Sequence, residues 1–222
     1  MKKIIFMLLL VFPILVKAQL AAPVEGEKAM SIGLKPSFTV SIKDLKAKKA
    51  ADLFEDFIKQ YKGKTKYNKK MTEYFTDNAQ IYYVAGAADV DVYTRVSEMG
   101  SSVDVSCFFI VNEVFVNSKN NADIAKNAME FMRLYAVSAE RYKVSEKLED
   151  EQKNMKKIES ELKRLVHENE GFHKNIEDYK AKIVKAEADI VTNQSAQDNA
   201  NKSIVDQAKV VESVKVALDA LK

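Results

Sequence analysis

The stretch Asp89–Val111, DVDVYTRVSEMGSSVDVSCFFIV, decides the fold of the first half of this chain. Apolar and polar side chains alternate on both sides of M-G-S-S, residues 99–102, with the period of two that is typical of strands. A short segment of glycine and serine between two such runs indicates a turn. We therefore predict an antiparallel hairpin formed by residues 89–98 and 103–111.

The second strand of this hairpin is apolar on both faces. Cys107 and Phe109 alternate with Phe108 and Ile110, so the two pairs lie on opposite sides of the sheet. A strand with two apolar faces needs cover on both sides. The sequence offers two candidates for the second cover, the helical pattern of Ile124–Tyr142 and a second subunit.

The residues that flank the hairpin predict a small α+β domain. F-T-V-S-I, residues 38–42, alternates as a strand, and apolar residues recur at helical spacing over residues 45–61. Short strand-like pieces follow at residues 71–76, 79–84 and 113–117. This order of elements predicts a small antiparallel sheet packed against a helix.

The first 18 residues have the layout of a secretory signal peptide. Lys2 and Lys3 precede an apolar run, Ile4–Val16, of roughly 13 residues, which is short for a bilayer-spanning helix of about 20 residues. The pattern ahead of Gln19 fits cleavage after Ala18. We therefore expect an exported, periplasmic protein. The alternative is that this segment remains as an N-terminal membrane anchor.

The net charge changes with this cleavage. The full sequence carries 35 Lys and Arg against 32 Asp and Glu. Lys2, Lys3 and Lys17 belong to the predicted signal peptide, so the remaining chain carries equal numbers of the two signs. The basic character is thus a feature of targeting, and we expect no nucleic acid partner.

The second half of the sequence has a helical heptad pattern. From Asn121 onward it contains no proline and a single glycine, Gly171. Apolar residues recur there in alternating steps of three and four, which indicates a coiled coil. These residues are Leu148, Met155, Ile158, Leu162, Leu165, Phe172, Ile176, Tyr179, Ile183, Ala186, Ile190, Ile204, Val211, Val214, Leu218 and Leu221.

Polar residues interrupt this row without breaking its phase. Asn169, Asn193, Gln197 and Gln207 occupy heptad positions that are otherwise apolar. The stretch N-Q-S-A-Q-D-N-A-N-K, residues 193–202, has two interpretations, a loop or a continuing helix with polar layers. The unbroken phase favours the helix, in which buried polar residues fix register and partner number at a cost in stability.

The path of the helical region is open to three interpretations. A bend at Gly171 would give two arms of about 50 residues, and we expect this helical hairpin. The alternatives are a turn near residues 193–202 and a single long helix in a parallel oligomer.

The sequence therefore divides into four segments. They are a signal peptide at 1–18, a proline- and glycine-containing linker at 19–36, an α+β globular domain at 37–118 and a helical coiled-coil region at 119–222.

Residues with catalytic or metal-binding chemistry are few. His167 and His173 are six apart, not at the three- or four-residue spacing that places two metal ligands on one helical face. Cys107 is the only cysteine, and we expect a buried thiol. Asp89 and Asp91 share a strand face, where a solvated surface is favoured over an acid–base pair. We expect no enzyme, no cofactor and no metal.

One segment concentrates positive charge, because no acidic residue lies between Asp56 and Glu73. These lysines could bind an anionic component of the cell envelope, or they could protect an edge strand from pairing with other chains. The candidate binding residues are Lys59, Lys62, Lys64, Lys66, Tyr67, Lys69 and Lys70.

With its V-K-A-Q signal end, F-T-V-S-I strand, Y-K-G-K-T-K segment, D-V-D-V-Y and heptads, the chain resembles small exported bacterial proteins of uncharacterised function that join an α+β domain to a coiled coil. The sheet pattern is similar to helix-grip domains. The helical arms are distantly similar to the Skp (OmpH-like) periplasmic chaperones, although here the arms follow the globular domain and are not inserted within it.

Three functions are then open. The first is a non-enzymatic scaffold or chaperone-like protein that binds a protein partner, or itself, through the coiled coil in the cell envelope. The second is an envelope polyanion-binding module that uses the Lys59–Lys70 segment. A hydrolytic enzyme is the least favoured of the three.

Overall fold

The computed structural model describes residues 21–220. These residues divide into two compact units, with the boundary between Glu151 and Gln152. The predicted signal peptide, residues 1–18, lies outside the described residues. The elements are β1 (Val24–Met30), β2 (Gly33–Lys43), α1 (Ala47–Lys59), β3 (Lys64–Asn68), β4 (Glu73–Ala79), α2 (Tyr82–Ala85), β5 (Val90–Met99), β6 (Ser102–Val111), β7 (Val114–Phe115) and α3 (Ala122–Asp219).

The globular unit is built on one antiparallel sheet, which confirms the α+β prediction. Its strand order is β1-β2-β6-β5-β4-β3, and β7 pairs with the outer part of β6. The predicted hairpin is β5 and β6, with Thr94 opposite Cys107. Gly100 provides the positive φ, 65°, that its short turn requires. β3 and β1 are the two edge strands.

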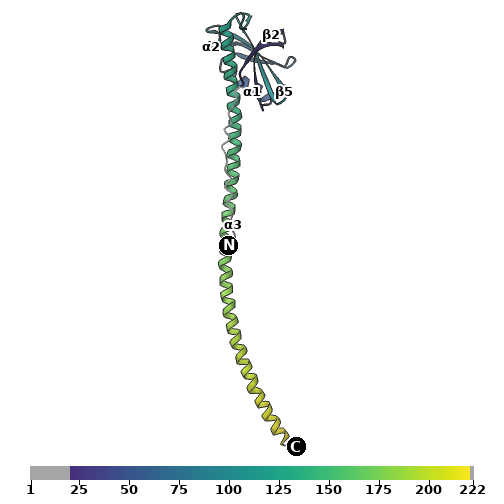
Figure 1. Ribbon diagram of the computed structural model, residues 1–222, viewed down its shortest axis with the longest axis vertical. Helices are drawn as coiled ribbons and strands as arrows, with labels where there is room; N and C mark the ends of the chain where they lie inside the picture. Colours follow the sequence, from purple (N-terminus) through teal and green to yellow (C-terminus); the bar gives the residue numbers. More distant parts are fainter. Residues whose placement is uncertain (1–20, 221–222) are drawn as a thin grey trace. The chain divides into compact units, whose positions relative to one another are not determined.

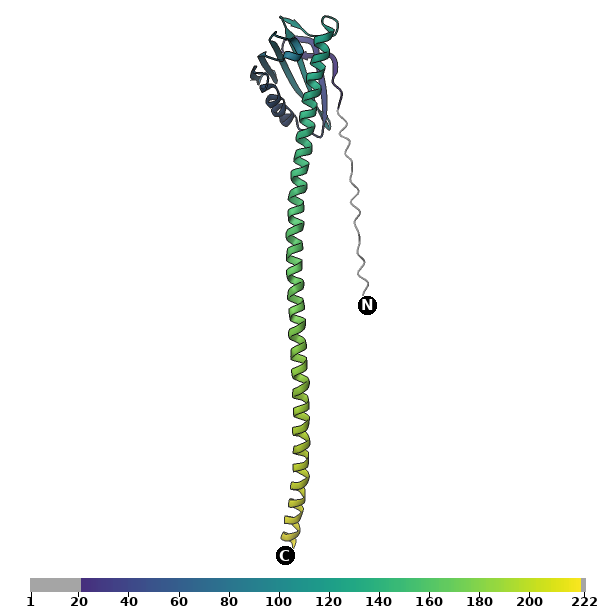
Figure 2. The ribbon, with the colours of Figure 1, turned by 90° about the vertical axis from the view of Figure 1, so that its left-hand side faces the viewer.

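The helices α1 and the start of α3 pack on one face of this sheet (Figure 1, Figure 2). Aromatic rings dominate the contact. The Phe131 ring on α3 lies 5.4 Å from Phe109 of β6 and 6.3 Å from Phe54 of α1. The buried Tyr135 hydroxyl donates a 2.8 Å hydrogen bond to the Ala50 carbonyl oxygen, which ties α3 to α1.

The opposite face of the sheet is covered from within the same chain. Phe108 on this face is fully buried. The β1–β2 turn reaches over the face, because Ser31 donates from its N–H and its hydroxyl to the Glu73 carboxylate on β4, at 3.1 and 2.6 Å. Arg95 of β5 donates to the Ala29 carbonyl oxygen at 2.7 Å. A second subunit is therefore not needed to cover β6.

The prediction of a linker at residues 19–36 is wrong, because this interval contains β1 and the beginning of β2. Its proline and glycine residues are compatible with this place in the sheet. Pro36 lies in the part of β2 that pairs with β1 only, since the pairing of β2 with β6 begins at Phe38. A missing N–H costs no ladder hydrogen bond on an unpaired side.

The prediction of a strand over residues 79–84 is also wrong beyond Ala79. The ladder between β4 and β5 is irregular between Thr76 and Ala79, and the chain then leaves the sheet. The short helix α2 follows, and it buries Val84 against the core. Here tertiary burial overrides the strand preference of tyrosine and isoleucine.

The long helix α3 runs without a break over 98 residues. The predicted hairpin at Gly171 and the alternative turn near residues 193–202 are therefore wrong, and the single long helix is the interpretation that holds. A Cβ added at Gly171 would meet nothing within 4 Å, so this glycine serves no close approach. Gln197 donates to Asn193 across one helical turn, as a continuous helix requires. Of the described residues, no helix is both long and apolar enough to cross a bilayer.

Candidate functional site

The largest candidate site is a row of apolar residues along α3, which we call the heptad face. Its members occupy heptad positions a and d, where Leu148 is an a position and Ile158 a d position. The large apolar members are Leu148, Met155, Ile158, Leu162, Leu165, Phe172, Ile176, Tyr179, Ile183, Ile190, Ile204, Val211, Val214 and Leu218.

The heptad face is uncovered in the single chain. Its large apolar side chains are 46–71% exposed, and every residue from 144 to 220 is exposed. Isolated surface apolar residues are normal, but a contiguous apolar row of this length marks an interaction surface. The row carries on the order of 1,000 Å² of exposed apolar area, above the roughly 800 Å² that each partner contributes to a standard protein interface.

Polar residues divide the heptad face into layers. Asn169 and Gln197 occupy a positions, and Asn193 and Gln207 occupy d positions. An unpaired amide in an apolar interface is costly, whereas an amide that meets another amide is satisfied. A partner of this face must therefore carry polar groups at the same positions along the helix axis.

The flanking e and g positions carry charges that are compatible with a parallel second copy. In that arrangement a g residue faces the e residue five positions later on the other helix. Lys182 at g would then face Glu187 at e, and no such g–e pair from Lys147 to Lys215 brings together like charges. The g and e positions thus allow two copies to run in the same direction. Glu151, at the d position between Leu148 and Met155, is the one layer of the face where such a pair brings like charges together.

The Lys59–Lys70 segment forms a second candidate site, and the structure divides it. Lys59 lies in the last turn of α1 and forms ion pairs with Asp56 and Glu55 at 3.0 and 3.7 Å. These pairs raise the pKa of Lys59, first through the hydrogen bond to Asp56. Lys62 lies in the following turn with a φ of 63°. Neither Lys59 nor Lys62 lines the hollow beside the sheet to which Lys66, Lys69 and Lys70 contribute.

The remaining lysines lie on or beside the edge strand β3. Lys64 stands opposite Asp77 of β4 in the register. Lys66, Lys69 and Lys70 line a hollow beside the sheet. The edge position of β3 is what the edge-protection interpretation requires, and the two roles of these lysines stay predictions.

Tyr67, which the sequence analysis grouped with the candidate binding lysines, has its ring on the other face of the sheet from Lys66. Strand alternation places its ring with Tyr74 on the face that carries the helices, with ring centroids 4.6 Å apart. Lys66 points to the opposite face. Tyr67 contributes to the wall of the hollow from between Lys66 and Asn68.

Sequence reasoning missed five residues of this hollow, which are Ser31, Asn68, Glu73, Phe75 and Tyr93. The alternation of β5 placed Tyr93 on the right face, but no sequence signal paired β4 with β3 and β5. Neither could the sequence show that the β1–β2 turn would bring Ser31 to this place.

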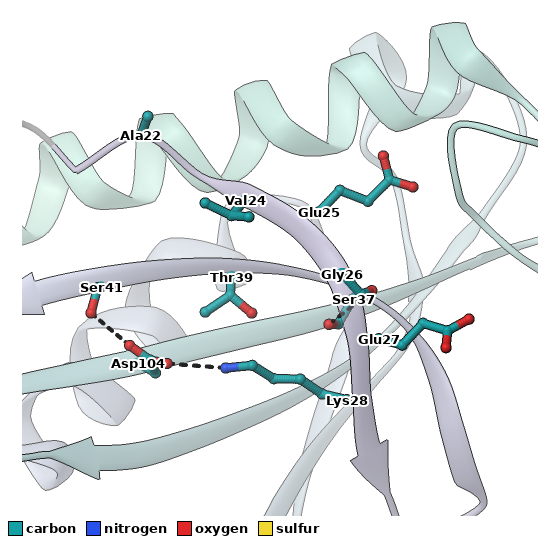
Figure 3. Close-up of a pocket in the computed structure, with 10 residues that line it drawn as sticks. All are labelled: Ala22, Val24, Glu25, Gly26, Glu27, Lys28, Ser37, Thr39, Ser41 and Asp104. Atoms are coloured by element: carbon teal, nitrogen blue, oxygen red, sulfur yellow. Dashed lines mark hydrogen bonds and ion pairs between the residues drawn. The ribbon is translucent and has the colours of Figure 1, made fainter.

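A smaller pocket lies between β1, β2 and β6 (Figure 3). Asp104 accepts a 2.6 Å hydrogen bond from Ser41 and a 3.0 Å one from the Lys28 ammonium. Burial disfavours the charged carboxylate, but these hydrogen bonds and the Lys28 charge outweigh it and lower the pKa of Asp104. The polar groups of this pocket form hydrogen bonds with one another, which is typical of a structural contact.

Two of the residues considered for catalysis, Cys107 and Asp91, make contacts within the sheet domain. Cys107 is buried next to the Thr94 hydroxyl, and burial raises the pKa of its thiol to about 12, so the thiol is protonated and unreactive at neutral pH. Asp91 accepts a hydrogen bond from the Asn78 N–H at 2.9 Å. Within residues 21–220, no three His, Cys, Asp or Glu side chains are placed to hold a metal ion.

No family model, no curated protein and no solved structure matches the chain. The resemblances noted from the sequence therefore remain expectations, and the chain is assigned to no family.

Proposed function

We propose that this protein is a non-enzymatic scaffold of the cell envelope, whose copies assemble through the heptad face of α3. The observation that supports this function is the exposed row of a and d residues from Leu148 to Leu218. An apolar row of this length is removed from water by a second helix with the same repeat, in knobs-into-holes packing.

A second copy of this chain is the occupant that the face fits best. In a parallel, in-register pair, Asn169 meets Asn169 and Gln197 meets Gln197, so each polar layer finds a matching amide. A shift by one heptad would place Asn169 against Ile176 and leave its amide unpaired. The central a positions Ile176, Ile183 and Ile190 are β-branched, as in two-stranded coiled coils, whereas Tyr179 and Ala186 stand at the d positions that leucine occupies there.

The test uses two cysteine variants at small d positions, Ala186→Cys and Ala200→Cys. In a parallel, in-register pair each new thiol faces its own copy at a distance that a disulfide can bridge. Mild oxidation should therefore cross-link both variants to covalent dimers, and it should leave the wild-type protein, with its buried Cys107, uncross-linked.

An antiparallel pair gives a different result, because a single cysteine meets its own copy only at the centre of such a pair. Cross-linking of at most one of the two variants would thus contradict the parallel arrangement. A protein that stays a single chain throughout would contradict self-assembly as a whole.

A second candidate function, binding of an envelope polyanion, is favoured by one specific observation. Among the described residues, no carboxylate lies within ion-pair distance of Lys66, Lys69 or Lys70, in contrast to Lys59. Changing Lys64, Lys66, Lys69 and Lys70 to Gln should weaken association with envelope material, and wild-type association should fall with salt. If the change instead promotes self-association and leaves binding intact, the lysines protect the β3 edge.

A further inference from the structure

We propose that the hollow at the outer end of β3 and β4 binds an acidic sugar unit, with its carboxylate among lysine ammonium groups and its ring against an aromatic pair. The proposal rests on the second candidate function above and narrows its ligand. The hollow measures about 570 Å³, which is the size of pockets that hold small organic ligands. It lies on the face of the sheet opposite the helices, so self-assembly through the heptad face is a separate question.

The positive side of the hollow consists of Lys66, Lys69 and Lys70. Their ammonium groups have no carboxylate partner among residues 21–220, so their charge is available to an anion. The turn that carries Lys69 and Lys70 is held in place by Asn68. Its side-chain oxygen accepts hydrogen bonds from the N–H groups of Lys70 and Met71 at 3.1 and 3.3 Å. The backbone that carries Lys69 and Lys70 is thus held in place before a ligand arrives.

The apolar side of the hollow is an aromatic pair. Phe75 of β4 and Tyr93 of β5 are direct neighbours in the register, with ring centroids 4.5 Å apart and planes at 35°. Lys66 stands opposite Phe75 in the same row across the sheet. Aromatic rings carry a negative face, which attracts the polarised C–H groups of a sugar ring. An inorganic anion would gain nothing from this pair.

The third side of the hollow is fixed by a buried acid, Glu73, which holds the β1–β2 turn in place. Glu73 is 3% exposed and accepts both hydrogen bonds of Ser31, and it stands opposite Arg95 in the register. These hydrogen bonds hold the β1–β2 turn as the third wall. Both donors are neutral, so the hollow combines the three lysines with one carboxylate.

The combination of these three sides selects the ligand class. Three ammonium groups next to an aromatic pair suit a ring with one apolar face and a carboxylate at its edge, as in a hexuronic acid. A phosphate polymer would use the lysines only, and a neutral sugar would use the rings only. Sugar units of both a free monosaccharide and a glycan fit this description.

The experiment titrates the protein with glucuronate and with a tetramer of galacturonate, and follows backbone amide signals by NMR. Glucose and inorganic phosphate are the reference ligands. We expect saturable shifts at Lys69, Lys70, Phe75 and Tyr93 with both uronates, and at least tenfold weaker binding of glucose and phosphate. Saturation by the tetramer alone would identify a glycan, and saturation by both would include the free sugar.

Two matched double variants separate the site from general charge. Lys69→Gln with Lys70→Gln removes two charges from the hollow, whereas Lys62→Gln with Lys64→Gln removes two charges outside it. We expect the first pair to weaken uronate binding by about tenfold and the second by less than twofold. Phe75→Leu, checked for folding by circular dichroism, should weaken uronate binding and leave the residual phosphate binding unchanged.

Equal losses in the two double variants, or phosphate binding as tight as uronate binding, would overturn the acidic-sugar site while leaving a polyanion-binding function standing. Absence of binding to any anionic polymer would overturn that function and the acidic-sugar site together.

Discussion

At the residue scale, Asp104 is the acid whose charged state the fold stabilises. Its pKa is lowered because the hydrogen bonds from Ser41 and Lys28 outweigh the burial that opposes its charge. A carboxylate with a lowered pKa contributes stability above its unfolded pKa of about 4, and this contribution is lost as the pH falls through its folded value.

Asp104→Asn should therefore lower the free energy of unfolding by about 1–2 kcal/mol at pH 7. The difference between wild-type and variant protein should begin to shrink below about pH 4, where the carboxyl of the unfolded chain is protonated, and should be lost as the pH falls through the lower pKa of the folded protein. Urea unfolding followed by the near-ultraviolet circular dichroism of the tyrosines measures both values. Asp89→Asn, at an exposed aspartate, is the matched control and should change little. A difference that stays constant from pH 7 to pH 3 would contradict this role of the Asp104 charge.

Residue-level prediction from the sequence worked where a side chain's environment follows from its own strand. The alternation of apolar and polar residues along the two strands predicted the burial of Cys107 and the structural role of Asp91. The hollow at β3 was only half predicted, because its lysines are contiguous in sequence whereas Phe75, Tyr93 and Ser31 come from other strands. Long-range pairing, which no local pattern encodes, brings those residues together.

At the element scale, Gly171 distinguishes a continuous helix from a bend. In α3 it has no positive φ and no close neighbour, so an added methyl group has space. Gly171→Ala should therefore stabilise the protein by about 1 kcal/mol per chain, since alanine loses less backbone entropy in a helix. Thermal unfolding monitored by circular dichroism checks this, and a lower melting temperature would indicate that the glycine serves a bend.

The polar layers of α3 lead to a second prediction at this scale. Replacing Asn193 and Gln197 by Ile should raise the melting temperature, because two apolar layers are added to the heptad face. It should also broaden the distribution of oligomeric states, because the matched amides that select the register are gone. Ser195→Ile with Asn199→Ile adds the same side chains at the same spacing outside the heptad face and should give neither effect. Light scattering with thermal melting measures both, and equal behaviour of the two variants would contradict the polar layers.

Helices and strands were predicted correctly where a local sequence pattern alone determines them. The β5–β6 hairpin and the long helix follow from periodicity, which is the physical requirement of a half-buried strand or an amphipathic helix. β1 was missed because Gly26 and Pro36 are read as loop residues, although an edge position tolerates them. The hairpin at Gly171 was predicted from arm length, but one glycine costs a helix only about 1 kcal/mol, which is too little to break it.

At the scale of the whole molecule, the proposed assembly would account for the contrast between the two units. The globular unit buries its apolar residues on both sides of the sheet, whereas residues 152–220 leave theirs exposed in the single chain. Heptad periodicity predicts that such a helix seeks a partner. The proposal that this partner is a second copy rests on the residues at the a, d, e and g positions.

The solution mass of the protein tests this central claim most directly. Sedimentation equilibrium at micromolar concentration should give twice the mass of one chain. Ile183→Lys with Ile190→Lys should reduce it to one chain, because two charges are placed in the heptad face. Val184→Lys with Val191→Lys adds the same charges at exposed positions outside the face and should leave the mass at two chains. A wild-type mass of one chain, or equal behaviour of the two variants, would contradict assembly through the heptad face.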